Sequence, residues 1–483
     1  MRNDDLAPHI LKNFPHQPTE EQLQVLHLWE DFLLSRESDL VFVLRGYAGT
    51  GKTSLVAALV KTWTAMQQRV VLLAPTGRAA KVMTGYSGMP AYTIHKFIYR
   101  RRSFGDDEHF TAMPNLLPNT LFIVDEASMI QNYGSGVQLF GEGQLLDDLL
   151  RYVYTGRNCR LILVGDEAQL PPVGETESPA LSTELLEGCG LMVMEYTLRQ
   201  VVRQAQESGI LWNATALRQM LTEGEVYNFP RLRTRGFSDI KTVSGEELLE
   251  SLEDSYSEVG LDETIVVTRS NKRAGLFNQG IRARILDMDE ELCYGDRVMI
   301  VKNNYLWMPQ PSVGEEHSSD FIANGDMAVV RRYGGEREVY GLRFVDAIIE
   351  LTDYDHLEVE ATVMLNTLQS ESPALSAEQQ KKLWNDVWED YADIPGKKER
   401  MKKMKEDIHL NALQIKYAYA VTCHKAQGGG WAHVYIDQGY VTEEMLSEDY
   451  FRWLYTALTR ATEKVYLINW PKQQREEGEV DDD

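Results

Sequence analysis

The stretch Gly46-Tyr47-Ala48-Gly49-Thr50-Gly51-Lys52-Thr53 lies between an apolar run at 40–44 and a helical pattern at 54–63. It matches G-x-x-x-x-G-K-[ST], the loop that binds phosphates where a buried parallel strand leads into a helix. The glycines let backbone N–H groups turn toward phosphate oxygens, and the start of the helix adds a positive dipole. The alternative is a glycine-rich turn with an incidental lysine, which the flanking strand and helix disfavour. We therefore predict a nucleoside triphosphate site.

Two side chains of this loop have defined tasks. Lys52 reaches the β- and γ-phosphates, and Thr53 offers its hydroxyl to Mg²⁺. The residues predicted to surround the nucleotide are Gly46, Ala48, Gly49, Thr50, Gly51, Lys52 and Thr53.

Polar residues also follow two further apolar runs, at 120–124 and 160–164. Asp125 is placed to hold Mg²⁺ and Glu126 to polarise an attacking water. Gln169 is predicted to sense the γ-phosphate, because its amide both donates and accepts hydrogen bonds. The alternatives are an acidic pair that caps a helix and a loop that ends at the prolines.

Strands and helices alternate along much of the chain, which predicts parallel sheets with crossover helices. Strands are expected at 40–45, 70–74, 120–124, 160–164, 264–268, 418–421, 434–436 and 464–468, and helices at 196–222 and 271–285. The pattern changes from Cys293 to about Val363. Short alternating runs at 297–301, 327–331 and 341–345 are separated there by Gly and Asn, which is typical of a small β-barrel. Residues 373–409 are charged and helical.

Composition limits the class of protein. The 483 residues are 43% hydrophobic and 25% charged, as in a soluble globular protein. No apolar stretch approaches the ~20 residues of a membrane span, and the N-terminus lacks a secretory signal. Four cysteines show neither metal-ligand nor disulfide spacing. We therefore expect a cytoplasmic protein with no membrane partner.

The net charge of −24 argues against a nucleic-acid partner, because phosphate backbones attract Lys and Arg. The charge is uneven, however. The tail at 476–483 is acidic, whereas Arg100–Arg102 and Lys397–Lys405 are basic. A local basic channel is compatible with this distribution.

The set and order of these motifs resemble the superfamily one helicases, and among them the B branch typified by RecD and Dda, over roughly residues 15–470. The resemblance implies an α/β fold of two tandem RecA-like P-loop domains with an inserted SH3-like β-barrel domain and a small pin insertion. It places the first RecA-like ATPase domain at 1–195, with the pin at about 85–118. The second RecA-like domain falls at 196–290 and 412–472, the SH3-like domain at 291–365, a charged helical insertion at 366–411 and a disordered acidic tail at 473–483.

The resemblance also assigns residues to the nucleotide. Thr19–Gln22 is similar to the glutamine motif, so Gln22 would contact the base; Thr19 and Gln22 also suit a helix capping box. Arg203 would reach the γ-phosphate, with Arg199 as its rival, and Arg460 would be a second arginine finger. The catalytic set is then Lys52, Asp125, Glu126, Gln169, Arg203 and Arg460.

DNA contacts are implied in the same way. The candidates are Pro75, Thr76, Arg78, Thr93 and His95 on the first domain, and Thr422, His424 and Lys425 on the second. Some have plainer readings: Thr76 as a helix cap, and His95 as a satisfied surface histidine. The pin candidates are Arg100–Arg102, Phe104 and Phe110, although the three arginines also suit a solvated face. Trp384 and Trp388 favour packing over base stacking. The run Gly428-Gly429-Gly430 holds more glycine than the family pattern.

The resemblance implies an ATP-dependent DNA helicase that moves 5′ to 3′ on single-stranded DNA and unwinds duplexes. ATP would be its substrate and Mg²⁺ its cofactor. Its partners would be single strands and single-to-double-strand junctions, and it would act as a monomer. The polarity rests on the resemblance alone. The alternatives are a DNA-stimulated ATPase that displaces bound protein, and a nucleotide-dependent binding module without motor activity.

Overall fold

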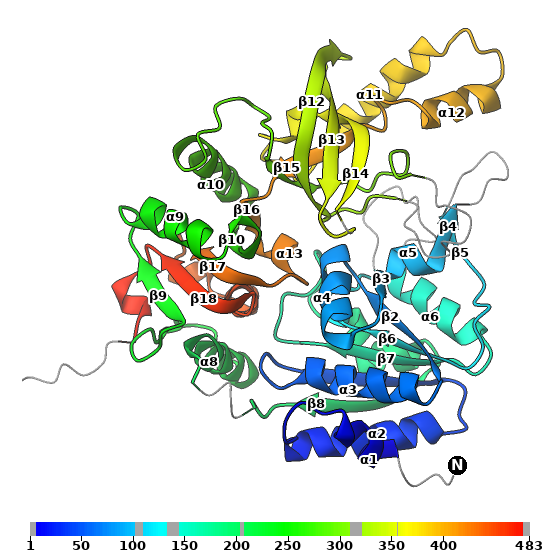
Figure 1. Cartoon of the computed structure of the whole chain (residues 1–483), viewed down its shortest axis with the longest axis vertical. Helices are drawn as coiled ribbons and strands as arrows, with labels where there is room; N and C mark the ends of the chain where they lie inside the picture. Colours follow the sequence, from blue (N-terminus) through cyan, green and yellow to red (C-terminus); the bar gives the residue numbers. More distant parts are fainter. Residues whose placement is uncertain are drawn as a thin grey trace, which may run out of the picture.

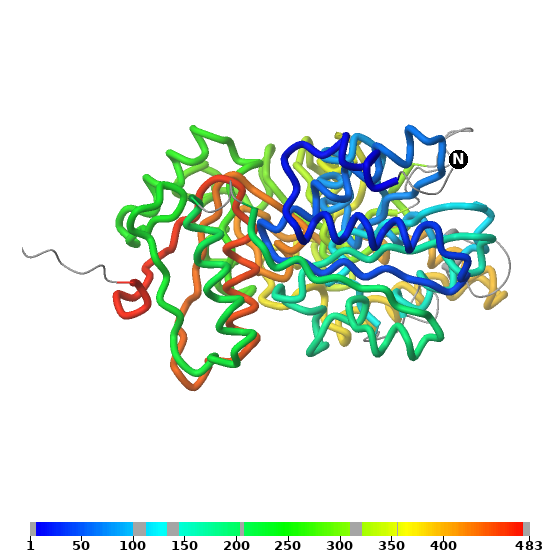
Figure 2. Tube along the Cα trace, turned by 90° about the horizontal axis from the view of Figure 1, so that it is seen from below, coloured from blue at the N-terminus to red at the C-terminus, as the bar shows by residue number. Residues whose placement is uncertain are grey.

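The computed structural model describes residues 6–101, 110–132, 144–202, 207–309, 321–354 and 356–476. Figure 1 shows two α/β units and a β-barrel. The N-terminal unit lies at the lower right, the second unit at the left, and the barrel with a helical arm at the top. Figure 2 shows the two α/β units packed side by side.

The first unit is built on a six-stranded sheet of order β3-β2-β6-β7-β1-β8, in which every pair is parallel. Its strands are β1 Leu40–Gly46, β2 Arg69–Ala74, β3 Ala91–Thr93, β6 Thr120–Val124, β7 Arg160–Gly165 and β8 Met192–Leu198. Its helices are α1 Leu6–Lys12, α2 Glu20–Leu34, α3 Lys52–Ala65, α4 Gly77–Ser87, α5 Ile94–Ile98, α6 Leu145–Thr155 and α7 Thr183–Gly188. All five residues of β6 are buried, so its apolar run predicts it to the residue.

The second unit has a parallel five-stranded sheet of order β16-β10-β17-β18-β9. Its strands are β9 Ile240–Val243, β10 Thr264–Thr268, β16 Ala420–Thr422, β17 Trp431–Asp437 and β18 Ala461–Ile468. Its helices are α8 Gly209–Glu223, α9 Leu248–Glu258, α10 Asn271–Arg284, α13 Cys423–Ala426 and α14 Glu448–Leu458. The two α/β units confirm the parallel-sheet prediction.

The helix predicted at 196–222 is wrong at its start. Residues 196–198 belong to β8, which pairs with β1 and carries the first sheet past the boundary expected at 195. The helix α8 begins only at Gly209, where Ser208 caps it by accepting a hydrogen bond from the Leu211 N–H. Tertiary pairing with the buried β1 therefore decides the conformation of these residues.

The β domain is a closed barrel of five strands: β11 Arg297–Ile300, β12 Met327–Val339, β13 Leu342–Leu351, β14 Leu357–Met364 and β15 Leu413–Tyr417. The last strand was expected in the second α/β unit, and the structure corrects this. β15 pairs with both β11 and β14 and so closes the barrel. The predicted helical insertion forms an arm of two helices, α11 Ala377–Asp390 and α12 Lys397–Lys405, between β14 and β15.

A short antiparallel hairpin lies in the predicted pin region. Its strands are β4 Tyr99–Arg101 and β5 Phe110–Ala112. The pin candidates Arg102 and Phe104 lie outside the described residues. The hairpin follows α5, and Figure 1 places it on the right-hand side of the molecule, below the helical arm.

The chain end is more ordered than predicted up to residue 476. Gln474 is buried, and its Oε1 accepts a hydrogen bond from Gln438 Nε2 at 2.8 Å. Leu232 and Arg475 form a parallel β-bridge. The rest of the predicted acidic tail, 477–483, lies outside the described residues.

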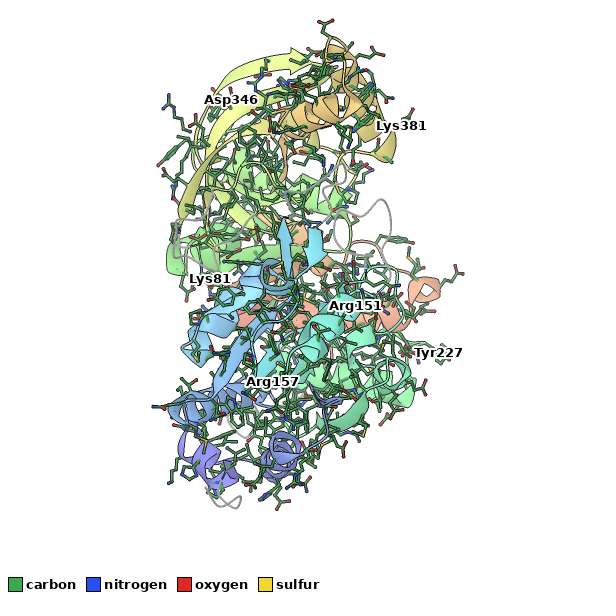
Figure 3. All side chains as sticks on the ribbon, turned by 90° about the vertical axis from the view of Figure 1, so that its right-hand side faces the viewer. Lys81, Arg151, Arg157, Tyr227, Asp346 and Lys381 are labelled. Atoms are coloured by element: carbon green, nitrogen blue, oxygen red, sulfur yellow. The ribbon has the colours of Figure 1, made fainter. Side chains whose placement is uncertain are left out.

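The three parts are held together by polar and apolar contacts. Tyr47, Ala168 and Leu170 of the first unit pack into the core of the second, among residues of α8 and α14. Lys81 of α4 donates to the Thr352 carbonyl at 2.8 Å and ties the first unit to the barrel; Figure 3 shows Lys81 below the barrel strands.

A buried ion pair joins the barrel to the second unit. Arg282 of α10 donates to both carboxylate oxygens of Asp296, at 2.8 and 2.9 Å, one residue before β11. Both side chains are buried, and the Glu290 carbonyl accepts a further hydrogen bond from Arg282. The guanidinium lies 4.3 Å from the ring centroid of Tyr417 on β15.

Replacing Arg282 by alanine should lower the free energy of unfolding by about 3–5 kcal/mol, because Asp296 keeps its buried charge without a partner. Urea denaturation followed by tryptophan fluorescence measures this. Arg343→Ala is the matched control: Arg343 is partly exposed and pairs with Glu336 and Glu291, and each such pair contributes less than about 1 kcal/mol. Equal losses for the two variants would contradict the assignment.

Candidate functional site

The predicted phosphate loop follows β1 and leads into α3. Gly51 adopts φ +83°, and a Cβ on it would lie 2.3 Å from Gln22 Nε2, so glycine is required there. Lys52 Nζ donates to the carbonyls of Gly46 and Tyr47 and lies 4.0 Å from the Asp166 carboxylate. The loop therefore presents its lysine at the carboxyl end of the sheet.

Gln22 is buried beneath this loop. Its Oε1 accepts from the Thr19 N–H at 2.9 Å, which confirms the capping box of α2. Its Nε2 donates to the Thr50 carbonyl at 2.9 Å. Gln22 thus fixes the phosphate loop through its amide, and its contact with the base stays a prediction.

Asp125 and Glu126 lie at the end of β6, as predicted. Asp125 Oδ2 accepts from the Tyr86 hydroxyl at 2.7 Å, and Oδ1 accepts from the Glu126 N–H at 2.9 Å. Glu126 has φ +52°, a left-handed conformation that is costly for glutamate and is found at functional sites. Burial raises the pKa of Glu126, and the positive charges of Arg460 and Lys52 oppose this shift.

The next strand, β7, contributes Asp166 and Gln169. Asp166 is buried, accepts from the Tyr455 hydroxyl at 2.6 Å and from the Ala168 N–H at 3.0 Å. Burial raises the pKa of Asp166, and Lys52 opposes the rise. Gln169 is also buried and hydrogen-bonds to Glu126; among the described residues its Oε1 has no hydrogen-bond partner.

These residues line a cavity of about 450 Å³ between the two α/β units. The first unit contributes Lys52, Thr53, Asp125, Glu126, Asp166 and Gln169, and the second contributes Ser208, Asp239 and Arg460. Thr53 and Asp125 offer a hydroxyl and a carboxylate, hard oxygen ligands that suit Mg²⁺. The predicted metal ligands therefore fit the ion. Among the described residues, no group of three or more His, Cys, Asp or Glu side chains could hold a metal ion.

Of the predicted arginine fingers, the structure brings Arg460 to the cavity. Arg460 is buried and donates to the carbonyls of Gly429 at 3.1 Å and Thr456 at 3.2 Å. Arg203 lies outside the described residues. Arg199 is exposed, and its N–H donates to the Glu21 carboxylate at 2.7 Å. The choice between Arg199 and Arg203 stays open.

Sequence reasoning missed Tyr455, which enters the phosphate loop from the second unit. Its hydroxyl accepts from the Ala48 N–H at 2.8 Å and donates to Asp166. The neighbouring Thr456 hydroxyl accepts from the Leu170 N–H at 2.9 Å. Tyr455 lies five residues before Arg460 in the same motif, and that position is the one signal the sequence offers.

Arg218 of α8 was also missed. Its guanidinium lies 4.3 Å from the ring centroid of Tyr47 in the phosphate loop. It also donates to the Arg199 carbonyl at 3.1 Å. No motif surrounds Arg218, so its position follows only from the packing of the two units.

A second cavity, of about 210 Å³, gathers predicted DNA contacts from all three parts. Its lining includes Thr76, Arg78, His424 and Lys425, together with Asn324 and Gly325 of the barrel domain. Lys425 donates to Asn324 Oδ1 at 2.5 Å, and burial lowers the pKa of Lys425 to about 8. Burial also lowers the pKa of His424.

The glycine-rich run after α13 lies against this cavity. A Cβ on Gly428, at φ +71°, would lie 2.9 Å from Thr76 Oγ1, so the extra glycine lets the units approach closely. Arg78 donates to the Gly430 carbonyl at 2.7 Å and lies 4.0 Å from the ring centroid of Trp431. Arg78 therefore joins the two units, and Thr76 caps α4 by accepting from the Ala79 N–H.

The remaining DNA candidates have different surroundings. Thr93 is buried and caps α5, so its hydroxyl is committed to the Lys96 N–H. His95 lies beside Tyr99 and the barrel-domain residue Phe321, and burial lowers its pKa to about 4. Pro75 is half-buried, and Thr422 lines a cavity of about 160 Å³ with Lys425. Their contacts with DNA stay predictions.

Two family models match the chain: an AAA domain over residues 30–237 and a UvrD-like helicase C-terminal domain over residues 417–468. The ATP-dependent RecD2 DNA helicase of Deinococcus radiodurans is 26% identical over 474 residues, which cover 96% of this chain and 50% of that protein. The ATP-dependent DNA helicase Dda of Enterobacteria phage T4 is 25% identical over 303 residues, 59% of this chain and 61% of Dda.

An uncharacterised protein, R530 of Acanthamoeba polyphaga mimivirus, is 22% identical over 92% of this chain and 98% of its own length. A crystal structure of a Pif1 helicase from Bacteroides with ADP-AlF3 and single-stranded DNA superposes with a TM-score of 0.46 and 15% identity, covering 96% of this chain and 95% of that one.

A phosphate loop in one parallel α/β unit, faced by an arginine from a second, defines a nucleotide hydrolase of the tandem-domain motor class. Within that class, the chain is similar to superfamily one helicases: it matches an AAA domain and a UvrD-like helicase C-terminal domain, and its relatives include the DNA helicases RecD2 and Dda. It spans about half the length of RecD2 and 61% of Dda. No helix of the described chain has the length and apolarity that a bilayer crossing demands. All four cysteines are free.

The hydroxyl of Tyr455 occupies the Ala48 N–H, which belongs to the loop predicted to hold phosphate. Tyr455→Phe should therefore tighten ATP binding in the absence of DNA by about five-fold, the equivalent of one hydrogen bond of ~1 kcal/mol. Titration with a fluorescent ATP analogue measures this.

Tyr450→Phe is the control, because that hydroxyl lies on the same helix and bonds Gln438 within the second unit. Unchanged or weaker ATP binding by Tyr455→Phe would show that the hydroxyl does not compete with phosphate.

Proposed function

We propose that this protein is an ATP-driven translocase that moves 5′ to 3′ along single-stranded DNA and unwinds duplexes ahead of it. The observation that carries the proposal is the cavity shared by Lys52, Glu126 and Arg460, three residues from two separate α/β units. Because the cavity walls belong to different units, hydrolysis can change how the units sit against each other. The relatives RecD2 and Dda, both ATP-dependent DNA helicases by name, support the same activity.

The chemistry follows from the charges in the cavity. Lys52 and Arg460 would bind the γ-phosphate from opposite sides and stabilise the charge of the transition state. Glu126 would orient the attacking water, with Gln169 beside it. Bound Mg²⁺, held by Thr53 and Asp125, would neutralise phosphate charge. Loss of the γ-phosphate would remove the contact that joins Lys52 to Arg460, and the cleft would open.

Coupling to DNA would pass through the second cavity. Thr76 on the first unit and His424 and Lys425 on the second face the same space, next to the glycine-rich run that leads back toward Arg460. Opening of the nucleotide cleft would therefore separate the two sets of contacts. A single strand held alternately by each set would advance with each cycle. The barrel, read as the SH3-like domain, would cover the strand, and the β4–β5 hairpin would act as the pin at the junction.

The wider setting of the activity is part of the proposal. Junctions between single and double strands would be the substrates, and one chain would suffice because both faces of the nucleotide cleft come from it. The free cysteines suit the reducing cytoplasm.

Duplexes with a single 5′ or 3′ tail test the polarity. We expect ATP-dependent strand separation with the 5′ tail and none with the 3′ tail, measured by a fluorophore and quencher on opposite strands. Lys52→Ala is the control and should abolish both hydrolysis and unwinding. Unwinding from the 3′ tail alone would overturn the polarity. DNA-stimulated hydrolysis without strand separation, but with displacement of bound streptavidin, would favour the protein-displacing ATPase instead.

Arg460→Ala should lower kcat for DNA-stimulated ATP hydrolysis by about 10³-fold while leaving the Kd for ATP within a few-fold, because a finger acts on the transition state. Steady-state kinetics and equilibrium nucleotide binding measure the two effects. Arg269→Ala is the matched control, an exposed arginine of the same unit that packs near the rings of Tyr450 and Trp453. An unchanged kcat for Arg460→Ala would reject its role.

A further inference from the structure

The second helix of the arm, α12, carries a strong local charge of the sign opposite to the whole chain. The nine residues of α12, Lys397–Lys405, include six basic side chains and one acidic side chain, whereas the chain has a net charge of −24. Lys397, Lys398, Lys402 and Lys403 are exposed. A solvated helix has no need of so uneven a charge, and a phosphate backbone would be attracted to it.

Beside these lysines, two stacked tryptophan rings and a guanidinium pack against one another. The rings of Trp384 and Trp388 on α11 lie with centroids 5.3 Å apart and an angle of 8° between their planes. The guanidinium of Arg400 lies 3.9 Å from the Trp388 ring centroid, and Arg400 also donates to the Trp388 carbonyl. The inner part of this stack therefore fastens α12 to α11.

The outer end of the stack is open. Trp384 is 39% exposed, one of the largest apolar side chains at the surface of the described chain. Packing explains Trp388, which contacts both the Trp384 ring and the Arg400 guanidinium. It does not explain a tryptophan that extends the stack into solvent. A flat exposed ring held by a second ring is the kind of platform on which a nucleobase stacks.

Lysines lie next to the stacked groups along both helices. Lys381 lies one helical turn before Trp384, and Lys397 and Lys403 lie one turn before and one turn after Arg400. Each lysine is therefore a neighbour, on its own helix, of Trp384 or Arg400. Lys403 also pairs with Glu406 at 3.6 Å, an exposed contact that contributes little and that phosphate can replace. Among the acidic groups of α11, Asp390 turns to the barrel and accepts from the Tyr340 hydroxyl at 2.5 Å.

The arm lies on the side of the molecule where strands would part. In Figures 1 and 3 it lies above the β4–β5 hairpin, on the same side of the molecule, and Figure 3 shows Lys381 at its outer edge. The cavity that gathers Thr76 and Lys425 lies between the α/β units and the barrel and would hold the tracking strand. A strand separated at the hairpin would leave on the side of the arm.

We propose that the α11–α12 arm binds the displaced strand of a fork, with a base stacked on Trp384 and phosphates held by Lys381, Lys397 and Lys403. The inference rests on the proposed function, because a displaced strand exists only where a duplex is opened. This binding would not depend on the DNA sequence, since every base has a face that can stack and every nucleotide carries a charged phosphate. The arm would hinder reannealing behind the junction.

Three DNA ligands test the proposal by fluorescence anisotropy without ATP: a single strand, a duplex with a 5′ tail, and the same duplex with an added 3′ tail on the other strand. For the wild-type protein, the added tail should tighten binding. Trp384→Ala should weaken binding of the two-tailed fork about ten-fold and leave the other two Kd values within two-fold. The triple variant Lys381→Gln/Lys397→Gln/Lys403→Gln should lower the slope of log K against log salt for the fork by about 2, at ~0.7 for each phosphate that the variant no longer binds.

Matched controls lie far from the arm. Tyr227→Ala removes an aromatic ring that is 80% exposed on the second unit, and Lys61→Gln/Arg69→Gln/Arg157→Gln removes three exposed charges of the first unit; Figure 3 labels Tyr227 and Arg157. These variants should bind the fork like the wild type.

Three results would overturn the proposal. If Trp384→Ala lost as much affinity for the single strand as for the fork, the tracking strand would lie on the arm. An equal loss of affinity for both duplexes would indicate contact with paired DNA. No loss of affinity would leave the basic helix for an acidic protein partner. A wild-type protein without DNA-stimulated ATP hydrolysis would reject the proposed function instead. The binding assay contains no ATP, so its result does not depend on hydrolysis.

Discussion

The hydroxyl of Tyr455 is the contact on which the arrangement of the two α/β units depends. It accepts a hydrogen bond from one phosphate-loop amide and donates to the buried Asp166, so it is fully satisfied only when the units are together. Separation of the units would leave Asp166 with its Ala168 N–H bond and the distant charge of Lys52. Thr456 follows on the same helix, and its hydroxyl accepts from the Leu170 N–H across the same interface. Arg460 lies just beyond the helix end, where carbonyls of its own unit hold it. The nucleotide cavity is thus a product of the interface rather than of either unit.

The same interface explains why the DNA candidates cluster. Gly428 approaches Thr76 closely, and Arg78 reaches across to the Gly430 carbonyl and the Trp431 ring. These contacts lie one short segment from Gly429, whose carbonyl accepts from Arg460. Only a few backbone atoms therefore separate the nucleotide cavity from the cavity that contains Lys425.

Sequence alone predicts the parts of the molecule that depend on local patterns. The apolar runs predict β6 and β10 to their end residues because every side chain in both strands is buried. The motifs predict Lys52, Asp125, Glu126 and Arg460, and the structure brings these four to one cavity. The capping pattern of Thr19 and Gln22 is confirmed, yet nothing in that spacing shows that the same glutamine holds the Thr50 carbonyl.

The wrong predictions concern segments whose conformation depends on packing against residues far away in the sequence. Residues 196–198 are predicted as the start of a helix, but they form a strand because β1 is alongside. The run 413–417 alternates apolar and polar residues and suits either of two sheets, and only the barrel geometry assigns it to β15. Tyr455 and Ala48 are 407 positions apart, so no local pattern connects them.

The pairing of β14 with β15 has a consequence for how this part of the chain can vary. The two strands run parallel, with Val363 opposite Leu413, and parallel neighbours need a crossover of a dozen or more residues. The segment that carries α11 and α12 supplies that crossover, so the barrel cannot close if it is cut to a tight turn. Lengthening it costs only slowly growing loop entropy. This point of the fold therefore tolerates growth but resists deletion, and in related chains new structure should accumulate here.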